Sequence, residues 1–544
     1  MHTPPRGPVD PAPTSAWEEA VRTALLGTDR RRAGPPTEPG ALLTTAAELV
    51  LARRAGLRPG PAPAAPAPAP PDPRPEPPEA ARRRLASLLA GRAAGPAARR
   101  APGPDLTELL PQWLATAVAH GYRAPSALLP ALLETARART DLRAPALALA
   151  GPRGRWLAAL NPEWRFVSRA PVPGAGLPDP ADGPAVHRLW GEGLFAERVA
   201  LLGLVRRRSP AAAVELLRAT WDTERAEDRL LFLDALRTGL SLADEPFLEA
   251  ALTDRSRNVR VTAAELLSAL PGSALAARMA ARATAHVGPG GTVPPAACDP
   301  GMEHDGVLPH PPSGRGARSW WLGQLVEAAP LDCWRERFDG AGPAEVLASA
   351  TGDRWGPDLH AGWCRAAIRQ RNAVWATALL GDPGAPVAAG PLTASPAERA
   401  GLLETLPEAE RAVWVAGFVR AHGLPEAFQL LGTCAVPWAG SLGEAVLDAL
   451  AAARDAGGYP WSFSGVMGLA ERCLDPSAAP RPTPGPPPPE GARDATAGAG
   501  GDPARGSAPV DPTQADAYWA EAFDRLAATL RVRATMAAEL EPPR

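Results

Sequence analysis

The chain contains no lysine, so all 57 of its basic residues are arginines. This absence excludes sites that need a lysine, such as the phosphate-binding G-x-x-x-x-G-K-[ST] loop and the Ser-x-x-Lys pair. Because alanine, glycine and proline abound, we interpret the missing lysine as codon bias of a GC-rich bacterial genome. With a net charge of −2 and a pI of about 6.5, the composition gives no electrostatic reason to bind nucleic acid. The triplet Arg206-Arg207-Arg208 is predicted to lie on a solvated face.

Cysteines and long apolar runs are also scarce. The five cysteines are odd in number, widely spaced and without a C-x-x-C pair, so they predict free thiols. No stretch reaches the roughly 18 consecutive apolar residues of a membrane helix, and the first residues lack the apolar core of a secretion signal. We therefore expect a cytoplasmic protein. The G-x-S-x-G and H-E-x-x-H motifs are absent too, and we expect no enzyme, cofactor or metal.

The 544 residues suffice for two or more domains with sizeable cores. The 67 prolines concentrate in two low-complexity runs, which predict disordered linkers at 59–78 and 476–512. Elsewhere helical patterns alternate with Gly or Pro breaks, and no useful length alternates with period two. The predicted parts are N-terminal helices at 15–58, a helical region at 79–185, repeats at 186–285, a polar loop at 286–318, a C-terminal helical region at 319–475 and a capping helix at 513–540.

Three helices between Leu194 and Ala283 repeat in a constant register. Arg198, Arg229 and Arg260 lie 31 residues apart in both steps, each on an amphipathic helix. A short break and a second helix follow each of them. A two-helix unit that cannot bury its apolar face alone is typical of a helical solenoid. We therefore predict an all-α fold, specifically a HEAT-like α-solenoid of antiparallel helix pairs.

The third of these units resembles the HEAT-repeat pattern, in which an aspartate in the turn precedes Val-Arg. Here Asp254 precedes Val259 and Arg260. The resemblance implies an internal polar ladder that contains Asp254 and Arg260 and, by position, Arg229 and Arg198. Such a ladder has a structural role, because an unpaired buried charge costs on the order of several kcal/mol.

The loop from Cys298 to Gln324 has the densest polar composition of the chain. We expect its charges to come together, either to pin the loop by its own ion pairs or to contact a partner. The candidate partner-binding residues are Asp299, Asp305, Arg315, Arg318, Trp320, Trp321 and Gln324. Substituting Arg315 and Arg318 is expected to weaken partner capture without unfolding the protein. Loss of thermal stability would instead show that the loop is structural.

The same loop also contains the residues of a conceivable zinc site. Cys298, His304 and His310 would supply three ligands and leave a position for water, which is the pattern of a catalytic zinc. Their spacing matches no zinc motif, and no fourth ligand is nearby. An enzyme that uses the 298–324 loop therefore stays an alternative to the non-enzymatic interpretation.

Several segments together resemble an uncharacterised bacterial family that is common in actinobacteria. The segments that carry the resemblance are the runs Trp17 to Arg30, Gly151 to Trp164, Asp244 to Glu249, Asp254 to Arg260 and Cys298 to Gln324. Genes of that family tend to lie beside those for a MoxR-like AAA ATPase, a von Willebrand factor A-domain protein and a SWIM zinc-finger protein. The resemblance thus implies a component of an assembly or maturation system.

These observations predict a scaffold or adaptor whose concave helical face holds a protein partner. The resemblance names an AAA ATPase or a von Willebrand factor A-domain protein as candidates. A nucleic-acid-binding role is an alternative, because HEAT-like repeats can line a concave face with arginine. Strongly salt-dependent binding to DNA or RNA would favour it.

Overall fold

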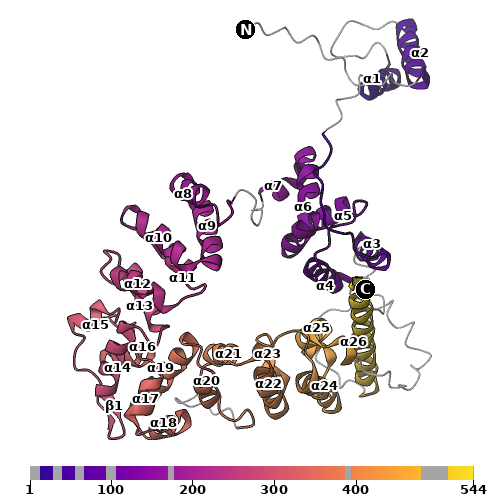
Figure 1. Ribbon diagram of the computed structural model, residues 1–544. Helices are drawn as coiled ribbons and strands as arrows, with labels where there is room; N and C mark the ends of the chain where they lie inside the picture. The colour runs from indigo at the N-terminus through magenta and orange to yellow at the C-terminus, as the bar shows by residue number, and fades with distance from the viewer. Residues whose placement is uncertain are drawn as a thin grey trace. The chain divides into compact units, whose positions relative to one another are not determined.

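The computed structural model describes residues 13–27, 39–55, 67–93, 106–169, 177–385, 394–478 and 512–542. Within these residues the chain is all-α, as predicted, apart from one antiparallel hairpin of β1 (Val287–Gly288) and β2 (Gly291–Thr292) (Figure 1). The chain divides into two units, Met1–Pro70 and Pro71–Arg544. Among the described residues, no helix combines the length and the apolar character that crossing a membrane requires.

The first unit contains two helices that contact each other, α1 (Pro13–Leu26) and α2 (Pro39–Ala55). Helix α1 ends at Leu26, and the next residue, Gly27, has a φ of 83°. That left-handed conformation ends a helix and favours glycine. Both helices leave large apolar side chains exposed, including Leu25 at 82% and Leu43 at 72%.

The second unit begins with a smaller hydrophobic core, in which Trp113 is fully buried. Its helices are α3 (Glu79–Ala93), α4 (Leu106–Ala119), α5 (Leu129–Ala138), α6 (Arg143–Leu160) and α7 (Arg165–Arg169), with 3-10 turns η3 (Thr140–Leu142) and η4 (Pro162–Trp164).

Part of the predicted linker at 59–78 is anchored to these helices. Residues 67–78 form no helix or strand, but Arg74 Nη1 donates to the Ala148 carbonyl at 2.6 Å, and the Arg123 amide donates to the Pro75 carbonyl at 2.9 Å. Residues 59–66 lie outside the described part of the chain. The proline run therefore ends as an extended segment that packs on the smaller core.

The three arginine helices lie where the register predicts them. Arg198 is on α9 (Phe195–Arg208), Arg229 is on α11 (Ala226–Leu236) and Arg260 is on α13 (Arg257–Ser268). The elements around them are α8 (Gly183–Glu192), α10 (Pro210–Thr220), η5 (Trp221–Thr223), η6 (Leu242–Asp244), α12 (Glu245–Ala251) and α14 (Ala274–His286).

Short caps start the second helix of each pair. In α10, Pro210 occupies the first turn and the Ser209 hydroxyl accepts from the Ala212 amide at 3.4 Å. Such residues satisfy or avoid the free amides of a helix start. Helix α11 contacts both α9 and α13, so neighbouring units share their apolar faces. The HEAT-like solenoid itself stays a prediction.

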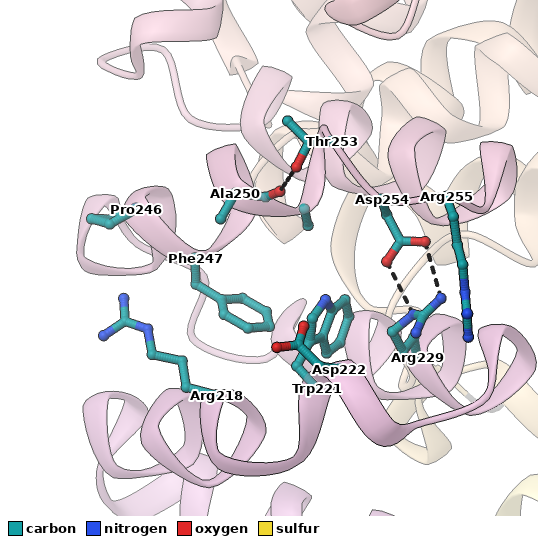
Figure 2. A pocket seen from close by; sticks show the side chains of 11 residues that line it. Arg218, Trp221, Asp222, Arg229, Pro246, Phe247, Ala250, Thr253, Asp254 and Arg255 are labelled. Carbon is teal, nitrogen blue, oxygen red and sulfur yellow. Dashed lines mark hydrogen bonds and ion pairs between the residues drawn. The ribbon is translucent and has the colours of Figure 1, made fainter.

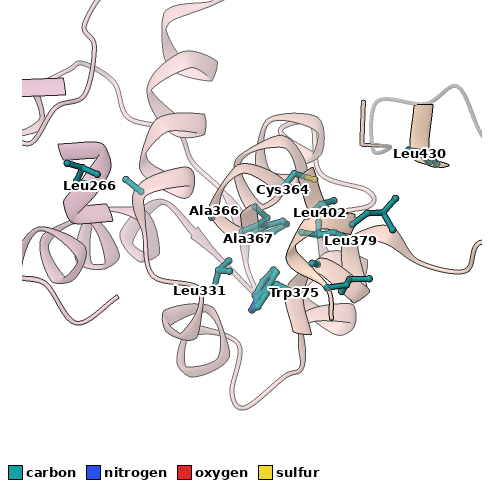
Figure 3. Packing of buried hydrophobic residues seen from close by; sticks show 14 of the residues in the cluster. Leu266, Leu331, Cys364, Ala366, Ala367, Trp375, Leu379, Leu402 and Leu430 are labelled. Atoms are coloured by element: carbon teal, nitrogen blue, oxygen red, sulfur yellow. The ribbon is translucent and has the colours of Figure 1, made fainter. Parts of the chain in front are cut away.

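Helices continue to the end of the second unit around one larger core that runs from Val186 to Leu530. Figure 3 shows part of this core, including Trp375, Leu379 and Leu402. The elements are α15 (Pro300–His304), α16 (Ala317–Ala328), α17 (Asp332–Arg337), α18 (Pro343–Ser349), α19 (Gly356–Arg369), α20 (Ala373–Leu380), α21 (Pro396–Thr405), α22 (Glu408–His422), α23 (Leu424–Leu431), α24 (Gly440–Asp455), η7 (Pro460–Phe463), α25 (Ser464–Cys473) and η8 (Pro476–Ala478).

The last helix, α26 (Pro512–Leu540), belongs to both cores of the second unit. Trp519 is fully buried in the larger core, and its indole Nε1 donates to the Gly458 carbonyl at 2.7 Å. Near its other end Leu540 is buried in the smaller core, and the Leu540 carbonyl accepts from the Tyr122 hydroxyl at 3.1 Å. The predicted capping helix therefore packs on segments from both ends of the unit.

We predict that Trp519→Ala lowers the free energy of unfolding by about 3 to 5 kcal/mol, because a fully buried aromatic leaves a cavity. Glu521→Ala on the same helix is the control, since Glu521 is exposed and its loss changes stability by less than about 0.5 kcal/mol. Denaturant unfolding followed by circular dichroism measures both. Equal stabilities of the two variants would contradict the docking of α26.

Candidate functional site

The arginines of the repeat register connect successive turns. Arg198 forms an ion pair with the Glu224 carboxylate, and Arg229 pairs with Asp254 at 3.0 Å. Arg229 Nη1 also donates to the Glu224 carbonyl at 2.9 Å, and Arg260 Nη1 donates to the Asp254 carbonyl at 2.7 Å. Arg229 and Arg260 thus hold the turns before their own helices, and Arg198 and Arg229 reach the acid of the turn that follows.

Glu224 is the member of this ladder that the sequence interpretation missed. Burial raises the pKa of the Glu224 carboxyl, but hydrogen bonds from Arg198 and Thr220 outweigh it, and the pKa is lowered. The guanidinium of Arg198 also lies over the Trp190 ring, 4.5 Å from its centroid. A signal was present, because an acid precedes Arg229 by five residues and Arg260 by six.

A second, fully buried pair joins Arg206 and Asp244. The prediction that Arg206 lies on a solvated face is wrong, because the residue is only 1% exposed. Its guanidinium contacts both carboxylate oxygens of Asp244 at 2.6 and 2.5 Å. It also donates to the carbonyls of four neighbouring residues, Thr238, Pro210, Leu236 and Gly239. The side chain therefore satisfies the backbone of a complete turn, which a single ammonium group could not do.

Asp305, a predicted partner-binding residue, is used inside the chain. It is 2% exposed, and its carboxylate forms ion pairs with two arginines of α14, Arg278 at 2.7 Å and Arg282 at 2.5 Å. Burial raises the pKa of the Asp305 carboxyl, but hydrogen bonds from these two arginines outweigh it, so the pKa lies below its ordinary value. The carboxylate is therefore not offered to a partner.

The other charges of the 298–324 loop also bind within the chain. Asp299 caps α15 by accepting from the Met302 amide at 2.8 Å. Arg315 pairs with Asp358 of α19 at 3.1 Å, and Arg318 donates to the carbonyls of Pro294 and Pro295 at 2.9 and 3.2 Å. The expectation that the four loop charges meet one another is wrong, because among the described residues each binds elsewhere.

The loop's aromatic and amide side chains hold its backbone. The indole Nε1 of Trp320 donates to the Leu308 carbonyl, and that of Trp321 donates to the Pro309 carbonyl, both at 2.9 Å. Gln324 accepts from the Leu308 amide at 2.8 Å. Hydrogen bonds to backbone groups therefore hold the loop, and not ion pairs between the loop's own charges as the sequence predicted.

The zinc alternative finds no support in the part of the chain that the structure describes, where no cluster of three or more metal-binding side chains occurs. The five cysteines are free thiols. Burial raises the pKa of the Cys298 thiol and raises those of Cys333 and Cys364 to about 12. At neutral pH these thiols are protonated and are poor nucleophiles.

A hollow of about 520 Å³ lies beside the polar ladder, between α10 and α12 (Figure 2). Trp221 and Phe247 line it and meet edge to face, with ring centroids 4.9 Å apart. The Arg229–Asp254 pair forms one wall, so the ladder shapes the hollow. The other lining residues are Arg218, Asp222, Pro246, Ala250, Ala251, Thr253 and Arg255.

The charged side chains at the hollow differ in whether they form ion pairs. Arg218 is half-exposed and pairs with Glu215 at 2.8 Å on the same helix, an interaction of small energy. Arg255 and Asp222 are exposed, and among the described residues neither side chain has an ion-pair partner. The hollow therefore combines an aromatic floor with charged groups that remain open to a ligand. None of its lining side chains except Arg229 and Asp254 was predicted as a site residue.

One family model matches the chain, the Family of unknown function (DUF5691), over residues 19–540. No curated protein and no solved structure matches the chain.

We predict that Asp244→Asn lowers the free energy of unfolding by about 3 to 5 kcal/mol, because it leaves the Arg206 charge buried without its partner. Asp234→Asn is the matched control. It breaks the exposed Arg237 pair, whose loss costs less than about 1 kcal/mol. Denaturant unfolding at pH 7 compares the variants, and similar costs would show that the buried pair does not stabilise the turn.

For the loop, we predict that Arg318→Ala lowers the free energy of unfolding by about 1 to 3 kcal/mol, since the Pro294 and Pro295 carbonyls lose their donors. Calorimetry measures the change. An unchanged unfolding temperature would return Arg318 to the group of residues available to a partner.

Proposed function

The chain belongs to this family of unknown function, and we propose that it acts as a non-enzymatic scaffold that holds a segment of a protein partner in the hollow beside Trp221. The observation that carries this proposal is that some charged side chains at the hollow form ion pairs and others do not. Arg229 and Asp254 neutralise each other in the wall, whereas Arg255 and Asp222 at the rim have no ion-pair partner among the described residues.

The chemistry of the hollow favours a segment with one apolar and one acidic side chain. Aromatic rings supply large contact areas at little entropic cost and commonly anchor protein interfaces. Arg218 and Arg255 lie on opposite sides of the aromatic floor in Figure 2, where each can pair with a carboxylate. Asp222 adds a single acidic group, so the rim favours acidic ligands without being uniformly basic.

A non-enzymatic role agrees with the way the described side chains are used. The acids of the ladder and of the 298–324 loop hold guanidinium groups or helix starts. The alternative of nucleic-acid binding gains no support, because Arg198, Arg206 and Arg229 are paired with carboxylates inside the chain. Such arginines are not available to phosphates.

For the partner we propose a MoxR-like AAA ATPase or a von Willebrand factor A-domain protein. This choice rests on the resemblance to a family whose genes tend to lie beside those for such proteins. The proposal therefore has two separable parts, the hollow as the binding site and the identity of the protein that enters it.

We predict that Arg255→Glu weakens binding of the full chain to its partner at least about tenfold, because an attractive charge at the rim becomes repulsive. Arg208→Glu is the matched control, since Arg208 is exposed on α9 outside the hollow. Biolayer interferometry with each purified candidate partner measures the affinities.

The outcomes separate the two parts of the proposal. Equal weakening by both variants would mean that the net charge of the chain matters rather than the hollow. Full binding by Arg255→Glu would exclude the hollow as the site. Absence of binding between the wild-type chain and either candidate would refute the choice of partner.

A further inference from the structure

Three aromatic side chains form an exposed stack where η7 meets the first turns of α26. The rings of Tyr459 and Trp461 are parallel within 13°, with centroids 4.3 Å apart. Tyr518 meets Trp461 edge to face at 5.6 Å. Trp461 is 58% exposed and Tyr518 is 41% exposed, so the stack presents its rings to solvent. None of the three rings belongs to the larger hydrophobic core.

The polar side-chain atoms of the stack have no hydrogen-bond partner in the part of the chain that the structure describes. Among the described residues, the Trp461 indole N–H and the Tyr459 and Tyr518 hydroxyls form no hydrogen bond. The neighbouring Trp519 provides the contrast, because it is fully buried and its indole donates to the Gly458 carbonyl. The stack therefore offers flat apolar rings together with three hydrogen-bond donors that no described residue engages.

A polyproline II segment is the ligand that complements such a surface. Proline has no backbone N–H, so a proline run presents carbonyl acceptors and apolar rings but few donors. Its conformation is already ordered before binding, which lowers the entropic cost of association. Grooves lined by aromatic residues recognise proline-rich segments in this way.

The chain carries such a segment next to the stack. Seven of the ten residues from Pro480 to Pro489 are prolines. The segment follows η8, near the point where the Leu474 carbonyl accepts from Arg533 of α26 at 2.6 Å. The chain must then return to Pro512, where α26 begins. From Arg533 to Pro512 the helix spans about 31 Å, and ten residues of polyproline II extend about as far.

We propose that the aromatic stack of Tyr459, Trp461 and Tyr518 binds the chain's own proline run at residues 480–489. The run is tethered on both sides, by η8 and by α26, and the stack is built from the elements on either side of it. Tethering gives the segment an effective concentration on the order of millimolar, so even a weak site is occupied. This binding is independent of the hollow beside Trp221.

A labelled peptide of the 480–490 sequence tests the proposal on the full chain by fluorescence anisotropy. Three proteins are compared: the wild type, a variant with Pro486→Ser, Pro487→Ser, Pro488→Ser and Pro489→Ser, and the same variant with Trp461→Ala. The four-serine variant should bind the peptide at least about tenfold more tightly than the wild type, whose stack is occupied. Adding Trp461→Ala should weaken binding at least about tenfold.

Leu231→Ala in the four-serine variant removes an exposed apolar side chain of α11 and should leave peptide binding unchanged. Circular dichroism verifies that Trp461→Ala is folded. Equal binding by the wild type and the four-serine variant would overturn the proposal, as would an unchanged affinity after Trp461→Ala. If dilution of the wild type restores its binding of the peptide, the proline run of a second copy occupies the stack. That result would also overturn the proposal.

Discussion

Pairing of buried arginine with carboxylate is the interaction on which the repeat region depends. Turns between helices leave backbone carbonyls without partners, and a guanidinium can satisfy several of them while it neutralises an acid. Arg206 does this for one complete turn, and Arg229 ties the turn at Glu224 to Asp254 of the next. In a chain without lysine, arginine is the only basic side chain apart from histidine that can take this role.

The same pairs determine which charges remain for binding. Arg229 and Asp254 fix the wall of the hollow and leave it nearly neutral, so the open side chains of Arg255 and Asp222 set its character. In the 298–324 loop, by contrast, Asp305 and Arg318 bind other residues of the chain and are not open to a ligand. A dense polar composition thus marks a well-anchored loop in this chain, and the more open surface lies in the repeats.

The helices were predictable from the sequence because apolar periodicity and caps are local signals. Arg198, Arg229 and Arg260 fall on their predicted helices for this reason. The buried position of Arg206 was not predictable, since its partner Asp244 lies 38 residues away and only packing brings them together. The hollow was missed for the same reason. Trp221 and Phe247 meet because η5 packs near α12, a contact that spacing along the chain does not encode.

Site-specific photo-crosslinking in the native host determines whether the hollow beside Trp221 holds a protein partner. A photoreactive residue replaces Thr253, which lines the hollow, or Arg208, which is exposed on α9 outside it. We expect one discrete protein adduct from position 253, identified by mass spectrometry as the AAA ATPase or the von Willebrand factor A-domain protein, and none from position 208. Identical adducts from both positions, or no protein adduct from position 253, would contradict this expectation.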